Sequence, residues 1–281
     1  MTEPDDLTRA RDELGDPDAL YQVNPAWFRT KLLVGVGLVG VGVGGVGLLF
    51  VVGFKAFHAL FHFILWPMLA GGGLILNLYR QRGLYVLLYP TGLLRLRRGE
   101  VESFPWDEVA EVRLKTQKVD AVVTVRGPDG EPVACWLPAE VPDVQVWTAG
   151  LTVVRADGAK AEFSPVLAGY DELAAEVQRR SFPPLWRDAV RRFRDGRVLA
   201  FGKLEASLLG LHHKGQVLPW PEVGKLAVTG GQLGIAQKGK WLPWATIKPA
   251  AEVPNLHVLF ALAAFAMEAP PVPDDDADED S

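Results

Sequence analysis

Near the N-terminus stand two apolar stretches that decide the fold of this chain: LLVGVGLVGVGVGGVGLLFVVGF, residues 32–54, and AFHALFHFILWPMLAGGGLILNLY, residues 56–79. Neither stretch contains a formally charged side chain, and Lys55 alone separates them. A helix needs about 20 residues to cross a hydrocarbon core of about 30 Å. Because the gap leaves room only for a tight turn, the sequence predicts a transmembrane helical hairpin over residues 31–80.

Basic residues flank the outer ends of this hairpin. Arg29 and Lys31 precede the first helix, Arg80 and Arg82 follow the second, and Lys55 is the one cation in the turn. The positive-inside rule therefore predicts an integral membrane protein with both termini and the remaining chain in the cytoplasm. The first stretch begins after an acidic leader and is too long for a signal-peptide core, so we interpret it as an uncleaved anchor.

Glycine recurs along the first apolar stretch in steps of three and four residues, at Gly37, Gly40, Gly44 and Gly47. This spacing places the four glycines on one helix face, and Gly40 and Gly44 form a GxxxG pair of the kind that lets helices approach closely in lipid. We interpret the face as the contact with the second helix of the hairpin. Association of two copies of the chain is the alternative.

The composition limits the remaining possibilities. The chain has 281 residues, a formal net charge of −5 and a single cysteine, Cys135. One cysteine excludes an internal disulfide and a cysteine-rich metal site, and the basic excess of a nucleic-acid-binding protein is absent. The leader, residues 1–30, is acid-rich and expected to be largely disordered, and the acidic tail, residues 269–281, is expected to be disordered.

Beyond residue 82 the hydrophobic period changes from that of a helix to that of a strand. Apolar and basic residues alternate in LLRLR, residues 93–97, which is typical of a half-buried antiparallel strand. Further strands are predicted at residues 133–137, 151–155 and 160–164, followed by helical stretches at residues 170–180 and 184–194. A second strand-rich block over residues 198–250 ends in an apolar helix over residues 255–267, with Asn255 as its N-cap.

The two strand-rich blocks contain related sequences. LLRLRRGEVESFPWDEV (residues 93–109) resembles LLGLHHKGQVLPWPEV (residues 208–223), and LGLHHKGQVLPWPEV recurs as LGIAQKGKWLPWATI at residues 233–247. Such self-similarity indicates an internal repeat. Trp106, Trp220 and Trp244 fall at equivalent positions, and we interpret them as buried structural side chains. Exposed platforms that stack on a ligand or on RNA are the alternative.

Three features carry a resemblance to a known family: the strand hairpins, the closing helix and a tryptophan before x-Glu-Val. The tryptophan motif occurs twice, as Trp106-Asp107-Glu108-Val109 and Trp220-Pro221-Glu222-Val223. The chain resembles bacterial pleckstrin-homology-like (PH-like) membrane proteins, an uncharacterised inner-membrane family with two transmembrane helices and a cytoplasmic β-rich part. The resemblance covers most of residues 84–267 and implies a fold, not an activity. It implies two such domains here, residues 81–195 with a helical linker and residues 196–268.

The expected fold class is therefore membrane-anchored α+β: an N-terminal two-helix transmembrane hairpin followed by two β-rich PH-like domains, each closed by a helix. Arginines cluster with aromatic residues in the helical linker, at Arg187, Arg191, Arg192 and Arg194. They predict either contact with anionic lipid headgroups or the solvated face of an amphipathic helix.

The sequence contains no nucleophile elbow, phosphate loop, HExxH motif or tight carboxylate pair. We therefore expect no enzyme, no cofactor and no metal site. The predicted function is a membrane-anchored interaction or sensing module that contacts the lipid bilayer and another membrane or cytoplasmic protein, but not nucleic acid. An enzyme with an unrecognised surface site and a subunit of a small oligomeric channel or transporter are the alternatives.

Overall fold

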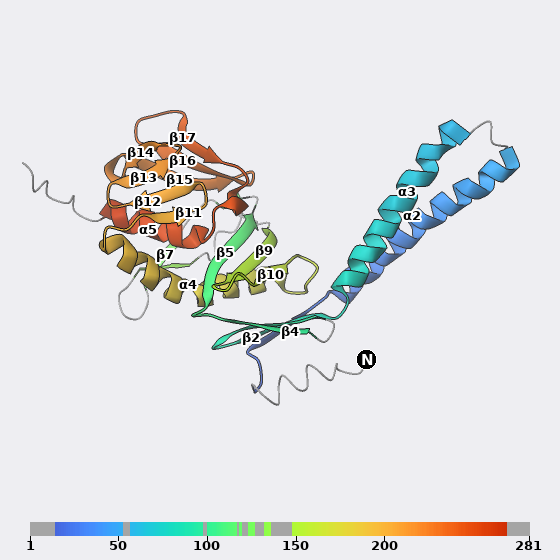
Figure 1. Cartoon of the computed structure of the whole chain (residues 1–281), viewed down its shortest axis with the longest axis horizontal. Coiled ribbons are helices and arrows are strands. Elements are labelled where there is room, and N and C mark those ends of the chain that lie inside the picture. The colour runs from blue at the N-terminus through green and yellow to red at the C-terminus, as the bar shows by residue number, and fades with distance from the viewer. Residues whose placement is uncertain are drawn as a thin grey trace, which may run out of the picture. The chain divides into compact units, whose positions relative to one another are not determined.

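A computed structural model of the chain describes residues 15–52, 57–97, 100–116, 118–119, 123–126, 132–135 and 148–268. The chain divides into two compact units (Figure 1), Met1–Ser103 with Val166–Tyr170, and Phe104–Pro165 with Asp171–Ser281. Both units combine helices with antiparallel sheets, which confirms the α+β class. The predicted domain boundaries at residues 80/81 and 195/196 differ from this division and stay predictions about independently folding parts. The expected tail lies outside the described residues.

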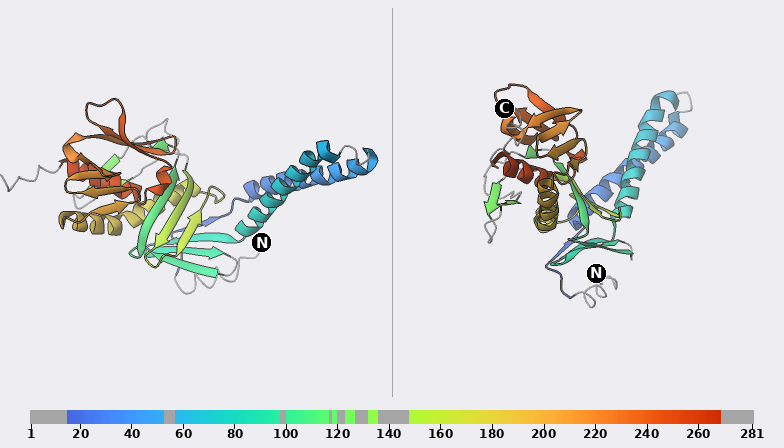
Figure 2. Two further views of the ribbon diagram at one scale, coloured as in Figure 1. Left: turned by 45° about the horizontal axis from the view of Figure 1, so that its top comes forward. Right: turned by 60° about the vertical axis from the view of Figure 1, so that its left-hand side comes forward.

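Two long helices, α2 (Pro25–Val52) and α3 (Phe57–Gln81), contain the apolar stretches of the first unit. Helix α2 begins at Pro25 because Asn24 caps it: the Asn24 Oδ1 accepts the backbone N–H groups of Ala26 at 3.0 Å and Trp27 at 3.2 Å. The two helices run antiparallel and side by side in every view (Figures 1 and 2).

The contact between α2 and α3 repeats every seven residues. On α3 the buried residues are Ile64, Gly71 and Leu78, and on α2 they include Gly35 and Gly42. A Cβ atom added at Gly71 would lie 2.7 Å from the Gly35 carbonyl oxygen, which requires glycine at this crossing. A seven-residue period is the spacing at which two nearly antiparallel helices keep one seam in contact.

The predicted glycine face is not part of this contact. Added Cβ atoms at Gly37, Gly40, Gly44 and Gly47 meet no atom within 4 Å, and all four residues are exposed. The prediction that they pack against the second helix is therefore wrong. The physical reason is that α3 covers the helix face bearing Gly35 and Gly42, so the interface follows the seven-residue spacing instead of the GxxxG pair. Association of copies through the glycine face stays a prediction.

One helical segment among the described residues, Pro25–Leu48, is long and apolar enough to cross a membrane. By length and composition it suits a membrane anchor or a signal sequence. Helix α3 is not identified as a second span. It contains Pro67 and ends on Asn77, Arg80 and Gln81. The transmembrane hairpin and its orientation therefore stay predictions.

A four-stranded antiparallel sheet completes the first unit. Its strands, in spatial order, are β1 (Ala19–Gln22), β2 (Leu84–Tyr89), β3 (Gly92–Arg97) and β4 (Glu100–Pro105). Strand β1 pairs with β2 from Ala19 opposite Leu88 to Gln22 opposite Tyr85. The expected disorder of residues 1–30 is thus wrong for the described residues 15–30. Pairing with β2, which would otherwise present an open edge, outweighs the acid-rich composition.

The second unit begins with a three-stranded antiparallel sheet in the order β10-β9-β5. Its strands are β5 (Val109–Thr116), β9 (Thr148–Arg155) and β10 (Lys160–Phe163). Strands β7 (Val123–Arg126) and β8 (Pro132–Cys135) pair with each other, and β6 (Lys118–Val119) pairs with β15 of the next block. The strands predicted at residues 151–155 and 160–164 are confirmed.

The second strand-rich block contributes one complete four-stranded sheet and three strands of another, whose fourth strand is β6. The first sheet contains β11 (Leu199–Phe201), β12 (Leu204–Ser207), β13 (Gly210–His213) and β14 (Gln216–Pro219). After the 3-10 helix η2 (Trp220–Glu222) come β15 (Val223–Thr229), β16 (Gln232–Gln237) and β17 (Pro243–Ile247). A 3-10 turn, η3 (Ala250–Glu252), leads into the apolar helix α5 (Leu256–Glu268).

Helix α4 (Tyr170–Arg194) is continuous, whereas the sequence predicted two helical stretches separated at Ser181–Pro183. Proline lacks the N–H of the helical ladder, so Pro183 and Pro184 weaken the helix locally. Tertiary packing compensates: Phe182 stacks on Trp186 with ring centroids 5.7 Å apart, and both side chains are buried in the core with α5. Helix α5 itself is almost completely buried, as its short apolar sequence predicts.

Candidate functional site

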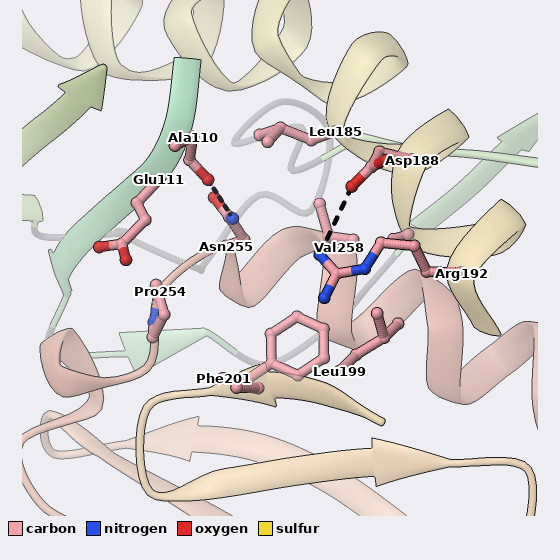
Figure 3. A pocket seen from close by; sticks show the side chains of 12 residues that line it. Ala110, Glu111, Leu185, Asp188, Arg192, Leu199, Phe201, Pro254, Asn255 and Val258 are labelled. Atoms are coloured by element: carbon pink, nitrogen blue, oxygen red, sulfur yellow. Dashed lines mark hydrogen bonds and ion pairs between the residues drawn. The ribbon is translucent and has the colours of Figure 1, made fainter. Parts of the chain in front are cut away.

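A cavity of about 270 Å³ lies in the second unit, between the edge of β5, helix α4, strand β11 and the start of α5 (Figure 3). Its polar side chains are Glu111, Asp188, Arg192 and Asn255, and its apolar wall includes Leu185, Leu199, Phe201 and Val258. Leu185, Asp188, Ala189 and Arg192 recur at three- and four-residue steps, so α4 presents them on one face. The cavity therefore combines charged and apolar groups.

Asn255 joins two walls of the cavity. Its Oδ1 accepts the Val112 N–H at 2.8 Å, and its Nδ2 donates to the Ala110 carbonyl at 2.9 Å. Its own backbone N–H donates to the Val112 carbonyl at 2.8 Å. Asn255 occupies the predicted N-cap position directly before Leu256, and its carbonyl accepts the Val258 N–H at 2.8 Å. Its side chain, however, binds the free edge of β5 and not the helix. Its φ of 51° is a conformation that asparagine tolerates.

The ionic groups of the cavity already have partners inside the protein. The Arg192 Nη1 lies 3.6 Å from the Asp188 Oδ2, and the Glu111 Oε2 lies 2.6 Å from the Arg113 Nη2. The Arg192 side chain is 43% exposed, so solvent reaches it. These groups can bind and orient an ionic ligand at the mouth, while the apolar wall receives a small apolar group.

The arginine cluster predicted from the sequence divides into separate environments. Arg192 lines the cavity, whereas Arg191 forms an ion pair with Asp188 at 2.5 Å and is exposed. The Arg194 guanidinium lies over the Phe265 ring at 5.5 Å, and the Arg187 Nε donates to the Pro183 carbonyl at 3.3 Å. Asp188 therefore compensates two of the four charges, and lipid contact by this cluster stays a prediction.

Sequence reasoning missed Glu111, Asp188 and Asn255 as neighbours. Asp188 precedes Arg192 by four residues on a helical pattern, which is a signal for an ion pair on one face. The approach of Asn255 to Ala110 and Val112 spans 145 and 143 residues, and no local pattern encodes such a separation.

The repeat tryptophans lie in two kinds of environment. Trp106 and Trp220 are buried, each in the turn between two strands, and the Trp220 Nε1 donates to the Ser207 carbonyl at 2.8 Å. Trp244 lies within β17, is half-buried and contacts the His213 ring edge-on at 6.2 Å. Trp244 therefore does not share the turn position of Trp106 and Trp220. It lies where the pairing of β16 with β17 is irregular, between Pro243 opposite Ala236 and Ala245 opposite Ile235.

Among the residues that the structure describes, three titratable groups have clearly shifted pKa values, and none of the three lines the cavity. Hydrogen bonds from Arg179 and then Arg180 lower the pKa of Glu176 to about 2, and a hydrogen bond from Arg155 lowers the pKa of Asp157 to about 2. Burial lowers the pKa of His257 to about 3, and neither ring nitrogen has a hydrogen-bond partner among the described residues. Within the same residues, no group of three histidine, cysteine or acidic side chains suits a metal ion.

The described residues define an α+β protein with an apolar N-terminal helix, several antiparallel sheets and a mixed polar and apolar cavity. Residues 142–271, less than half of the chain, match a family described as "Family of unknown function (DUF6585)". This match includes β9, β10, α4 and the complete second strand-rich block. No curated protein and no solved structure matches the chain.

Proposed function

We propose that the protein is a membrane-anchored interaction or sensing module, in which α2 and α3 form the anchor and the β-rich part works in the cytoplasm by binding. The order of elements carries this proposal. A four-stranded antiparallel sheet, a second antiparallel sheet and a helix follow one another twice. The first set is β1 to β4, β5-β9-β10 and α4, and the second is β11 to β14, β15 to β17 with β6 added at their edge, and α5. This order supports a pair of PH-like folds.

The helix pair supports the anchor. Val36, Val41, Val43 and Leu69 expose large apolar side chains on the outside of the pair. In water such a surface is unfavourable at roughly 25 cal/mol for each Å² of apolar area, whereas a hydrocarbon environment removes that cost. The cations at both outer ends favour an orientation with the termini in the cytoplasm.

The cavity supports binding by the β-rich part. Its charged rim and its apolar wall suit a ligand that combines an ionic group with a small apolar group, such as a side chain of a protein partner. Its described lining offers carboxylates, a guanidinium and an amide that hold a ligand in place through charge and shape.

Membrane extraction and cysteine labelling test the proposal. In cells that express the full chain with Cys135→Ser, we expect the protein to stay in the membrane fraction after alkaline carbonate treatment. A cysteine at Ala56, which lies outside the described residues, should react with an impermeant maleimide from the outside, whereas Gln81→Cys should react only after lysis. Extraction by carbonate would contradict the anchor, and labelling of Gln81→Cys alone in intact cells would contradict the orientation.

A further inference from the structure

The loop between β16 and β17, residues 238–242, carries an unusual pair of apolar side chains. Trp241 is 95% exposed, more than any other large apolar side chain that the structure describes, and the adjacent Leu242 is 67% exposed. Three residues later in the hairpin, Trp244 packs against the core instead. The base of the hairpin is fixed by Ile235 and Ala245, which are opposite each other and buried. A rigid support therefore holds an apolar tip in water.

Positive charge lies beside this tip, although the whole chain is acidic. Residues 223–251, which form β15, β16 and β17, contain no aspartate or glutamate. They contain four exposed lysines: Lys225, Lys238, Lys240 and Lys248. Lys238 and Lys240 directly precede the tip, and no ion pair joins either of them to a described residue. Lys225 lies opposite Ala236 near the base of the loop, whereas Lys248 lies at the other end of the hairpin. The nearest acidic residues along the chain are Glu252 and Glu222. The Glu252 Oε2 lies 2.6 Å from the Lys203 Nζ, and Glu222 accepts a hydrogen bond from the Gln237 Nε2 at 2.7 Å at the base of the loop.

We propose that this loop docks on the surface of an anionic bilayer, with Trp241 and Leu242 inserted at the level of the headgroups and Lys238 and Lys240 against lipid phosphates. Indole prefers this zone because its ring is apolar and its N–H is polar. Lysine extends its charged end toward the phosphates while its methylenes remain in the apolar zone. Each lysine near an anionic surface contributes about 1 kcal/mol.

The loop and the arginine cluster are alternative lipid contacts. Figures 1 and 2 show helix α4 and the loop between β16 and β17 at opposite ends of the second unit. One flat bilayer cannot contact both ends at once. Asp188 compensates Arg191 and Arg192, whereas the lysines of the loop have no such carboxylate among the described residues. The charge and the exposed tryptophan both favour the loop. This inference rests on the proposed anchor, which keeps the loop within reach of a bilayer.

An environment-sensitive fluorophore on the loop tests the docking. The full chain with Cys135→Ser and Leu242→Cys is labelled with a nitrobenzoxadiazole maleimide and reconstituted into nanodiscs of phosphatidylcholine, with or without phosphatidylglycerol. We expect a blue-shifted emission in the anionic discs, quenching by lipids with spin-labelled acyl chains, and reversal by salt, since 0.1 M salt screens charge over about 10 Å. A label at Val217→Cys, an exposed position on β14, should stay in water in both discs.

Charge variants separate the two surfaces. Lys238→Gln with Lys240→Gln should lower the ratio of docked to undocked loops about 30-fold, which corresponds to about 1 kcal/mol for each lysine. Glutamine at Arg187, Arg191, Arg192 and Arg194 should leave the emission unchanged. A loss of the blue shift in the arginine variant alone would overturn the proposal in favour of α4.

Other results of the fluorescence experiment also distinguish the docking of the loop from the membrane anchor. Emission typical of water in anionic discs that contain the full chain would overturn the docking and leave the anchor intact. A shift produced only by lipid-free cytosol would likewise overturn it, in favour of a protein partner. If the chain fails to enter nanodiscs, the anchor is refuted. The labelled chain is then added to preformed anionic vesicles, where a blue shift supports the docking and its absence overturns it.

Discussion

Replacement of Asn255 by glycine measures what holds β5 to the start of α5. Asn255→Gly removes both side-chain hydrogen bonds to Ala110 and Val112 but keeps a residue that adopts a positive φ freely. Each lost hydrogen bond costs about 1 kcal/mol, and the buried N–H of Val112, left without a partner, adds about 1–2 kcal/mol. We expect the free energy of unfolding to fall by about 3–4 kcal/mol.

Asn255→Ala separates the hydrogen bonds from the backbone conformation. Alanine loses the same two hydrogen bonds and must also adopt a φ of 51°, which costs a residue with a Cβ about 1 kcal/mol more than glycine. The order of stability should therefore be wild type, then Asn255→Gly, then Asn255→Ala.

Urea unfolding of the full chain in detergent, followed by tryptophan fluorescence, gives the measurement. With a dependence of about 2 kcal/mol for each molar of urea, the midpoint for Asn255→Gly should fall by about 1.5–2 M. A wild-type midpoint for Asn255→Gly would refute the reasoning about the hydrogen bonds. Equal midpoints for the two variants would refute the reasoning about φ.

Other predictions address the core and the helix pair. Trp220→Phe keeps the buried ring but removes its N–H bond to a backbone carbonyl, so the unfolding free energy should fall by about 1–3 kcal/mol in the same urea assay, and Trp220→Ala by about 3–5 kcal/mol. Burial keeps His257 neutral in the folded state, whereas the unfolded imidazole binds a proton below about pH 6.5. The contribution of the neutral His257 to the free energy of unfolding is therefore complete above pH 6.5 and is lost as the pH falls toward 3, by about 2 kcal/mol at about pH 5. The variant His257→Leu should lose about 2 kcal/mol less stability than the wild type between pH 6.5 and pH 5. An unchanged dependence of stability on pH would contradict this prediction. With Cys135→Ser, a Gly45→Cys and Ile64→Cys pair should form a disulfide on mild oxidation, because a Cβ atom added at Gly45 would lie 3.8 Å from the Ile64 Cβ. Crosslinking of a Gly44→Cys and Ile64→Cys pair instead would contradict the observed helix face.

Local patterns were sufficient for most individual elements. Alternation of apolar and polar side chains predicted the strands that became β3, β9 and β10, because a half-buried strand must bury every second residue. The apolar run over residues 255–267 predicted the closing helix α5, which is almost completely buried. The leader was misread because its acid-rich composition indicates disorder, while β1 gains its backbone partners from β2, more than sixty residues away, and from the still more distant Ala168.

The candidate site was predictable only in part. Arg192 was recognised as one of a basic cluster, but its neighbours Glu111 and Asn255 come from distant segments. The partners of a cavity depend on long-range contacts that no short motif encodes.

The sequence by itself determined the apolar helices, the alternating strands and the acidic balance, since hydrophobic period and charge are local properties of the chain. The tertiary structure decided which helix face forms the contact, which tryptophans are buried and which segments enclose the cavity. Several faces of an apolar helix satisfy the same composition, and Gly42 and Gly44 differ only in the side that α3 covers. Likewise, Trp241 and Trp244 are three residues apart, and only the packing of β17 makes one solvent-exposed and the other part of the core.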